Sequence, residues 1–150
     1  MSNLGRIKHQ WPECIKADFL DLFVGAHLGS GIARDVFVYE VDSSKVLKIE
    51  YASQSFQNAR EWQIWHDLKD APAFAKWLAP CHWISPCGMV LIQSRTMPAN
   101  DKQRPARMPR FLTDTKRSNY GMLKDRFVCH DYGTAIVDYS GRERGVDWWD

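Results

Sequence analysis

The chain has 150 residues, of which 45% are hydrophobic, 25% charged and 13% aromatic. This composition predicts a globular fold with a buried core and excludes a disordered chain. The formal net charge of +2 gives no reason in itself to expect a polyanionic partner. There is neither an apolar run of about eighteen residues nor an apolar segment near the N-terminus, so we expect no membrane span and no signal peptide.

The cysteines are spread along the chain without the paired spacing of a zinc site. They are Cys14, Cys81, Cys87 and Cys129. We interpret them as free thiols, which suit the reducing cytosol, and therefore expect a cytoplasmic protein.

In chain order, the first expected element is an amphipathic helix over 14–23, closed by Gly25. A glycine turn, a strand, a tight turn and a second strand are expected over 27–52. The most regular helical pattern lies in 53–70, with a serine as candidate N-cap and Pro72 after its end. The first half therefore predicts strands with one long helix inserted.

Two short strands are expected over 81–85 and 88–94, joined by a turn. Residues 96–110 are basic, contain three prolines and lack periodicity, so we interpret them as a linker into a second, smaller lobe. That lobe is expected to be mostly loop, with strands over 126–130 and 134–139. Strands with an inserted helix, then a loop-built lobe, predict an α+β fold.

The polar stretch "FLTDTKRSNYGMLKDRFVCHDYG" (111–133) contains the first candidate site residues. Asp114, Lys116 and Asn119 stand close together, and Asp131 follows a short strand. Asparagine and aspartate oxygens suit Mg²⁺, a separate aspartate can accept a hydroxyl proton, and a lysine can neutralise a phosphoryl group. The alternative is a solvated turn, where Asp and Asn are common.

A second group of candidates lies in the first half of the chain. The sequence "LGSGIARDV" is a glycine turn that leads into a strand, and glycines allow close backbone approach to phosphates. Lys48 lies in an apolar strand, and Glu61 shares the apolar stripe of the long helix, so the two could pair. A plain hairpin turn, a lysine reaching outward and a glutamate at the rim of the helix are the alternatives.

In this order, the pieces resemble the motif set of the protein-kinase-like superfamily: a Gly-rich loop, a strand lysine, a helix glutamate, a catalytic loop and a D-F-G turn. Here they are Gly29-Ser-Gly31-x-x-Arg34-x-Val36, Lys48, Glu61, Asp114-x-Lys116-x-x-Asn119 and Asp131-Tyr132-Gly133. The resemblance implies one two-lobe domain. Its N-lobe over 1–97 would hold an antiparallel sheet and one helix, and its reduced C-lobe over 98–150 would hold the catalytic loop.

The resemblance also implies roles for these residues. Lys48 would hold the α- and β-phosphates of ATP and pair with Glu61, Asp114 would be the catalytic base, and Lys116 would meet the γ-phosphate. Asn119 and Asp131 would bind Mg²⁺. The remaining nucleotide contacts would come from Leu28, Gly29, Gly31, Val36, Val46 and a hinge over Gln93–Met97.

The sequence departs from the family pattern in three places. Arg34 replaces the third glycine of the loop, and Leu112-Thr113 replaces the His-Arg pair before the catalytic aspartate. The A-P-E motif is missing, and only residues 134–150 follow the D-Y-G turn. We therefore expect a kinase-like protein reduced to its nucleotide site, of a size that suits a compact viral or mobile-element genome.

Two functions remain open. The first is an ATP- and Mg²⁺-dependent phosphotransferase of the serine/threonine protein kinase type, since the loop fits that pattern better than the pattern of the aminoglycoside phosphotransferases. The second is a catalytically silent kinase-like scaffold that binds and modulates or inhibits a partner protein.

The sequence offers two places where such a partner could bind. One is the basic segment 101–117, which is either a solvated linker or a docking patch for a protein partner or substrate. Apart from Phe111 it lacks the interleaved aromatic residues of a nucleic-acid site, so nucleic acid is not expected there. The other is the pair Trp148 and Trp149. These tryptophans either cap the core of the smaller lobe or form an interface with a partner or with a second copy in a homodimer.

Overall fold

The computed structural model describes residues 13–51, 55–136, 138 and 140–150. The fold is α+β, as the sequence predicts, with one five-stranded antiparallel sheet, few helices and two short antiparallel ladders. In spatial order, the strands of the sheet are β1 (Val24–Ser30), β2 (Arg34–Tyr39), β3 (Lys45–Glu50), β5 (Val90–Ser94) and β4 (Cys81–Ile84). In the described part of the chain, no helix is long and apolar enough to cross a bilayer.

The sheet has one strand more than the sequence predicts before residue 52. Gly25 was expected to end the first helix, but it lies inside β1, which pairs antiparallel with β2. A Cβ atom on Gly25 would lie 3.0 Å from the backbone oxygen of Val38 on β2, so close approach of the neighbouring strand explains this glycine. The tight turn and the strand that follows it, β3, lie where the sequence predicts them.

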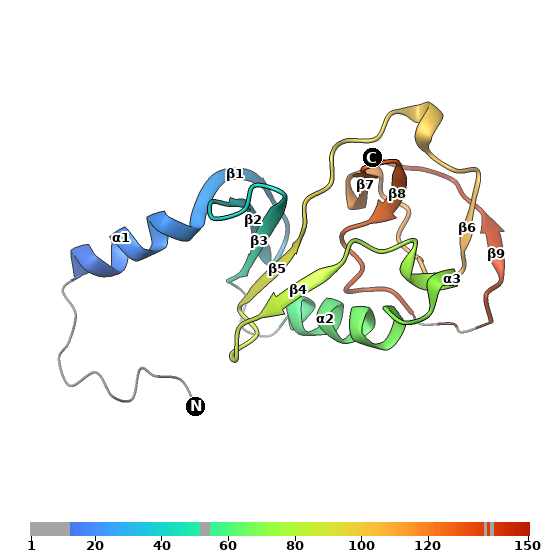
Figure 1. Ribbon diagram of the computed structural model, residues 1–150. Coiled ribbons are helices and arrows are strands. Elements are labelled where there is room, and N and C mark those ends of the chain that lie inside the picture. The colour runs from blue at the N-terminus through green and yellow to red at the C-terminus, as the bar shows by residue number, and fades with distance from the viewer. Residues whose placement is uncertain (1–12, 52–54, 137, 139) are drawn as a thin grey trace.

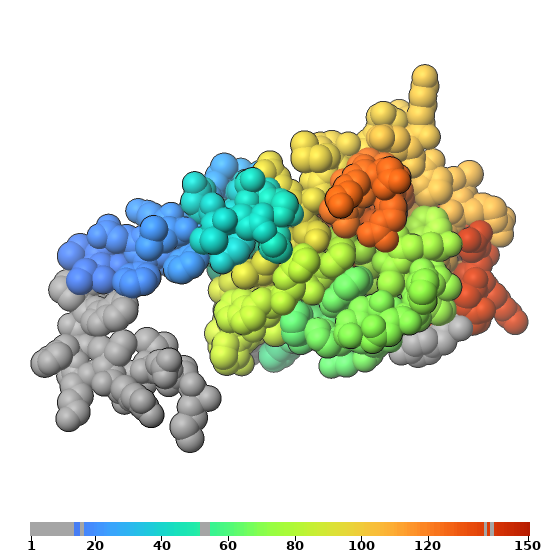
Figure 2. All heavy atoms as spheres, in the orientation of Figure 1, coloured from blue at the N-terminus to red at the C-terminus, as the bar shows by residue number. Residues whose placement is uncertain are grey.

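The first helix, α1 (Glu13–Phe23), confirms the element expected over 14–23. In Figures 1 and 2 it extends away from the sheet. Its apolar side chains remain exposed, with Leu20 at 61% and Leu22 at 59%. Helical periodicity therefore predicted the helix, although this stripe is not buried in the core.

The second helix, α2 (Gln57–Leu68), is the long helix expected over 53–70, and residues 52–54 lie outside the described residues. The expected serine N-cap is wrong for the described residues, because Phe56 stands at the N-cap with φ 51° and no side-chain cap. The carboxylate of Glu50 on β3 instead accepts hydrogen bonds from the first two helical N–H groups, at 3.1 and 3.2 Å. A negative charge at a helix N-terminus is favourable, and tertiary structure supplies it here.

A short helix, α3 (Pro72–Ala75), follows α2 and leads into β4. The turn between β4 and β5 contains Gly88 at φ +76°, which agrees with the turn expected there and explains the glycine. In Figure 1, α2 lies along the sheet beside β4.

The second part of the chain is more regular than the sequence predicts. The segment expected to be an unstructured linker contains η2 (Asp101–Gln103) and β6 (Arg107–Pro109). The polar stretch that follows contains η3 (Arg117–Asn119), β7 (Tyr120–Leu123) and β8 (Arg126–Cys129). β7, which was not predicted from the sequence, forms a hairpin with the expected strand β8.

The strand expected over 134–139 is wrong for the described residues there, which are in turn or irregular conformation. The last strand is instead β9 (Glu143–Gly145), which pairs with β6. The partner of β6 therefore comes from further along the chain than the expected strand.

One hydrophobic core joins the sheet, α2 and the second part of the chain. Its buried members include Leu68 of α2, Leu91 of β5, Phe111, and Cys129 of β8. Trp148 packs on the rings of Tyr120 and Phe127, whose centroids lie 5.0 and 5.5 Å from its own. This core fixes the polar loop of residues 111–119 relative to the sheet.

Candidate functional site

A buried ion pair joins the sheet to the long helix. The Nζ atom of Lys48 on β3 lies 2.8 Å from Oε2 of Glu61 on α2, and the two side chains are 3% and 0% exposed. Burial alone would raise the pKa of the Glu61 carboxyl, but the positive charges of Lys48 and Arg34 outweigh it and lower that pKa to about 2. The pairing that the sequence suggests is therefore present, and the Glu61 carboxylate is charged at neutral pH.

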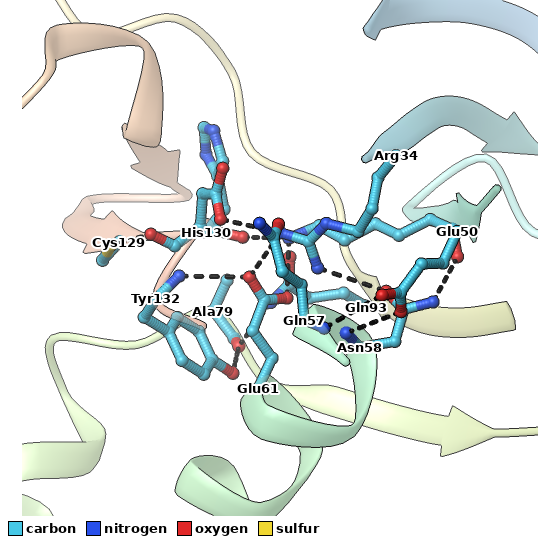
Figure 3. Close-up of polar contacts among 12 residues, drawn as sticks. Arg34, Glu50, Gln57, Asn58, Glu61, Ala79, Gln93, Cys129, His130 and Tyr132 are labelled. Atoms are coloured by element: carbon cyan, nitrogen blue, oxygen red, sulfur yellow. Dashed lines mark hydrogen bonds and ion pairs between the residues drawn. The ribbon is translucent and has the colours of Figure 1, made fainter. Parts of the chain in front are cut away.

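Arg34 is a third member of this cluster, and the sequence did not predict a role for its side chain. Its Nη2 atom lies 2.8 Å from Oε1 of Glu61 and 2.7 Å from Oδ1 of Asp131, and its Nη1 donates to Oδ1 of Asn58 at 3.1 Å. Figure 3 shows the Arg34 side chain reaching from β2 toward α2. The guanidinium is 5% exposed, so it belongs to the interior of the site.

A signal for Arg34 was present in the sequence. Side chains alternate along a strand, so Arg34 lies on the same face of β2 as Val36. In the sheet, Val36 pairs with Lys48 and Arg34 pairs with Glu50, which places these four side chains on one face. Val36 was expected to face the site. Because Arg34 precedes it by two residues in the same strand, the Arg34 side chain should face the site too.

The D-Y-G turn is bound directly to this cluster. The backbone N–H of Tyr132 donates to Oε1 of Glu61 at 3.1 Å, and Nζ of Lys48 donates to the backbone oxygen of His130. The Tyr132 hydroxyl donates to the Ala79 carbonyl at 2.8 Å (Figure 3). These bonds fix the position of Asp131, which lies between His130 and Tyr132.

Asp131 lies at the more open edge of the cluster, because its side chain is 44% exposed while that of Arg34 is 5% exposed. Partial burial and the nearby Glu61 carboxylate raise the pKa of Asp131, and Lys48 and Arg34 oppose this effect. An approaching ligand would therefore meet the Asp131 carboxylate before the rest of the cluster.

The catalytic-loop candidates divide into two groups. The backbone oxygen of Asn119 accepts hydrogen bonds from the N–H groups of His130 and Asp131, at 2.9 and 3.3 Å, so Asn119 lies beside the cluster. The carboxylate of Asp114 accepts the backbone N–H of Lys116 at 3.1 Å. Among the described residues, no hydrogen bond or ion pair joins the side chains of Asp114 and Lys116 to the cluster.

The Lys116 side chain contacts one of the last residues of the described chain, Trp149. Its Nζ atom lies 5.5 Å from the ring centroid of Trp149, a cation–π distance, and the backbones of the two residues pair in parallel. Asp150 lies 2.7 Å from a guanidinium nitrogen of Arg117. Residues 149 and 150 therefore cover one side of the catalytic-loop candidate.

The residues expected around the adenine lie on the first three strands. Leu28 on β1 is 47% exposed, whereas Val46 on β3 is 6% exposed. The backbone N–H of Gly31 donates to the Arg34 carbonyl at 2.7 Å, which closes the glycine turn. Gly29 pairs with Val36.

The segment expected to be the hinge connects the sheet directly to β7. Gln93 is fully buried in β5, and Met97 exchanges two backbone hydrogen bonds with Met122, at 2.9 and 2.7 Å. A pocket of about 300 Å³ lies beside this segment. The residues that line it include Thr96–Ala99, Arg117, Ser118 and His130. Leu28, Val36 and Val46 are not among the residues that line it.

His130 links this pocket to the ion cluster. Its ring nitrogens lie 2.7 Å from the Thr96 hydroxyl and 2.8 Å from the Ser118 carbonyl. Burial and the charge of Lys48 lower the pKa of His130 to about 4, so the ring is neutral at pH 7. His130 therefore bridges the expected hinge and the expected catalytic loop as a neutral hydrogen-bonding group.

The two expected magnesium ligands, Asn119 and Asp131, carry hard oxygen atoms that suit a divalent ion, but the positive charge of Arg34 beside Asp131 opposes one. Within the described ranges, no three His, Cys, Asp or Glu side chains gather as metal ligands. A metal at Asn119 and Asp131 would thus take its other ligands from phosphate and water. One oxygen of Asp131 already contacts Arg34.

No family model matches the chain, and no curated protein matches it. The resemblance to the protein-kinase-like superfamily rests on the sequence motifs.

Proposed function

We propose that this chain is a minimal kinase-like protein that binds ATP and transfers its γ-phosphoryl group to a protein hydroxyl. The observation that supports this best is the buried Lys48–Glu61 pair, bound on one side to the D-Y-G turn. A lysine in a core strand is costly to bury unless it is paired, and hydrophobic residues of similar volume would stabilise the fold as well or better. A functional requirement for a fixed cation explains why the pair is present.

In this proposal the chain has a two-lobe arrangement. The sheet and α2 would form the N-lobe, and residues 98–150 would form a reduced C-lobe that carries Asp114, Asn119 and Asp131. Two features support it: the five motifs occur in the family's order, and the last of them contacts the cluster through Glu61. The expected hinge also leads directly from β5 toward β7.

Each site residue has a chemical role in the proposed reaction. Lys48, held by Glu61, neutralises charge on the nucleotide phosphates. Asp114 accepts the proton of the acceptor hydroxyl. The hydroxyl oxygen bonds to the γ-phosphorus while the bond between that phosphorus and the β–γ bridging oxygen breaks, which releases ADP. In the family pattern Asn119 and Asp131 would hold Mg²⁺, which would neutralise phosphate charge; here Arg34, bound to Asp131, already places a cation at that position. Lys116 would leave the Trp149 ring to meet the γ-phosphate.

The test is calorimetric titration of the purified full chain with ATP, in Mg²⁺ and in EDTA. Lys48→Met is expected to weaken ATP binding at least tenfold, while Arg34 keeps a cation on Glu61 and preserves the fold. Lys45→Met is the matched control, because Lys45 lies on the same strand and pairs with Asp42 outside the cluster. Equal ATP affinity in the two variants would remove Lys48 from the phosphate site.

Phosphoryl transfer needs a separate measurement. With radiolabelled ATP and a generic protein acceptor, Asp114→Asn is expected to abolish transfer while leaving ATP affinity within about threefold of the wild type. Full transfer by this variant would show that Asp114 is not the base.

A second function, a kinase-like scaffold for a partner protein, is supported by a different observation. Residues 149 and 150 cover Lys116 and Arg117, and Trp149 remains 50% exposed. An exposed tryptophan beside a basic segment is a suitable anchor for another protein or for a second copy of this chain. Under this alternative, ATP at millimolar concentration would not bind, and Trp149→Ala would abolish association, measured for the homodimer by analytical ultracentrifugation.

A further inference from the structure

The cluster around Glu61 is balanced in charge by the protein itself. Its cations are Lys48 and Arg34, and its carboxylates are Glu61 and Asp131. Two positive and two negative groups sum to zero. A nearby third carboxylate, Glu50, is already used, because it caps the N-terminus of α2.

Arg34 supplies the second positive charge that balances the two carboxylates of the cluster. Its Nη2 atom contacts both carboxylates, at 2.8 Å from Glu61 and 2.7 Å from Asp131, so it bridges them. The guanidinium is 5% exposed and is also held by Asn58, which is fully buried. A group held by three partners does not exchange freely with solvent, so this contact is a built feature of the site.

We propose that Arg34 acts as an internal counter-ion for Asp131 in place of a divalent metal, so that nucleotide phosphates bind at Lys48 with little dependence on Mg²⁺. This proposal rests on the proposed function for its ligand, a nucleoside triphosphate. A divalent ion at Asp131 would sit next to the guanidinium, and the repulsion between like charges would weaken its binding. Removal of Arg34 would free the carboxylate oxygen and create a stronger metal site.

Arg34 is therefore assigned as a positioning residue that acts through Asp131. A merely structural role, in which Arg34 joins β2 to α2 and to the D-Y-G turn, would affect stability but not affinity for metal. Metal affinity in the absence of nucleotide separates these two roles. Mn²⁺ is a suitable probe because it accepts the oxygen ligands that Mg²⁺ takes and its free concentration is measured by electron paramagnetic resonance.

The first experiment titrates Mn²⁺ into the full chain without nucleotide. Arg34→Met is expected to bind Mn²⁺ at least tenfold more tightly than the wild type, and adding Asp131→Asn to this variant is expected to remove the gain. Arg126→Met is the matched control, because it removes the same charge from an exposed position on β8. A folded Arg34→Met protein that gains no Mn²⁺ affinity would overturn the proposal.

Circular dichroism establishes whether Arg34→Met folds. If it does not, the wild type and Asp131→Asn still decide the matter. The proposal expects both proteins to bind Mn²⁺ equally weakly, and wild-type binding that is lost in Asp131→Asn would overturn it.

The second experiment compares ATP binding by the wild type in EDTA and in Mg²⁺. The proposal expects dissociation constants that agree within about threefold, and a requirement for Mg²⁺ would overturn it while leaving the proposed function in place. Absence of ATP binding in both conditions would instead overturn the proposed function, and the Mn²⁺ measurements would still decide the role of Arg34 toward Asp131.

Discussion

Replacing Glu61 tests whether the buried cluster stabilises the fold as an ion network. The Glu61 carboxyl has its pKa lowered from 4.5 to about 2, a difference of about 2.5. At about 1.4 kcal/mol per pKa unit, this corresponds to roughly 3 kcal/mol of stability at neutral pH. Glu61→Gln removes that contribution and leaves two buried cations with one carboxylate, so we expect a loss of about 3–5 kcal/mol in the free energy of unfolding.

The pH dependence gives the sign of the effect. Because the pKa in the folded protein lies below the ordinary value of 4.5, the stabilisation is complete above about pH 4.5 and is lost as the pH falls toward 2. Between about pH 5.5 and about pH 3, the wild type should lose about 2 kcal/mol through this one group. Urea denaturation followed by circular dichroism at the two pH values measures this loss.

The control is the double variant Lys48→Met/Glu61→Gln, which removes the pair together and leaves Arg34 bound to Asp131. It should recover much of the stability lost in Glu61→Gln, because no unpaired cation remains. It should also lack the acid-dependent loss that belongs to Glu61. A Glu61→Gln protein as stable as the wild type, or equal acid losses in the wild type and the double variant, would refute this account of the cluster.

Three further predictions concern the surroundings of the site. Gly121→Ala should lower stability by about 1–3 kcal/mol in thermal denaturation, because its Cβ would lie 2.7 Å from the Met97 carbonyl; an unchanged melting temperature would show that the expected hinge is not packed against β7. Tyr132→Phe should cost about 1–3 kcal/mol, since its hydroxyl donates a 2.8 Å hydrogen bond to a buried carbonyl; a loss well below 1 kcal/mol in urea denaturation would argue that this bond adds nothing. Cys14 and Cys87 are exposed and should react with a thiol reagent in the native protein, whereas the two buried thiols should react only after unfolding; four rapidly reacting thiols would contradict the packing around the D-Y-G turn.

The elements that the sequence predicted well are those with strong local patterns. Helix α2 follows from its apolar periodicity, and the same periodicity placed Glu61 on the buried stripe with Ile64 and Leu68. The turn at Gly88 follows from its proline and glycine. These features depend on side-chain spacing and on backbone freedom, which neighbouring residues determine.

The errors share a different cause. The serine cap of α2 was wrong because Glu50, on another strand, supplies the negative charge. Strands β1 and β7 were missed because each contains one glycine, Gly25 or Gly121, that lies close to a neighbouring segment, and local pattern does not reveal such a contact. The strand expected over 134–139 failed because β6 pairs with β9.

The sequence by itself determined the α+β class and the chemical groups of the candidate site, because periodicity and residue type are local properties. Tertiary structure decided which of those groups meet. It brought Lys48, Glu61 and Asp131 together, and it added Arg34 to the same cluster. It also placed Lys116 under Trp149. Ion pairs between residues distant in the chain depend on strand register and helix packing, which only the folded chain defines.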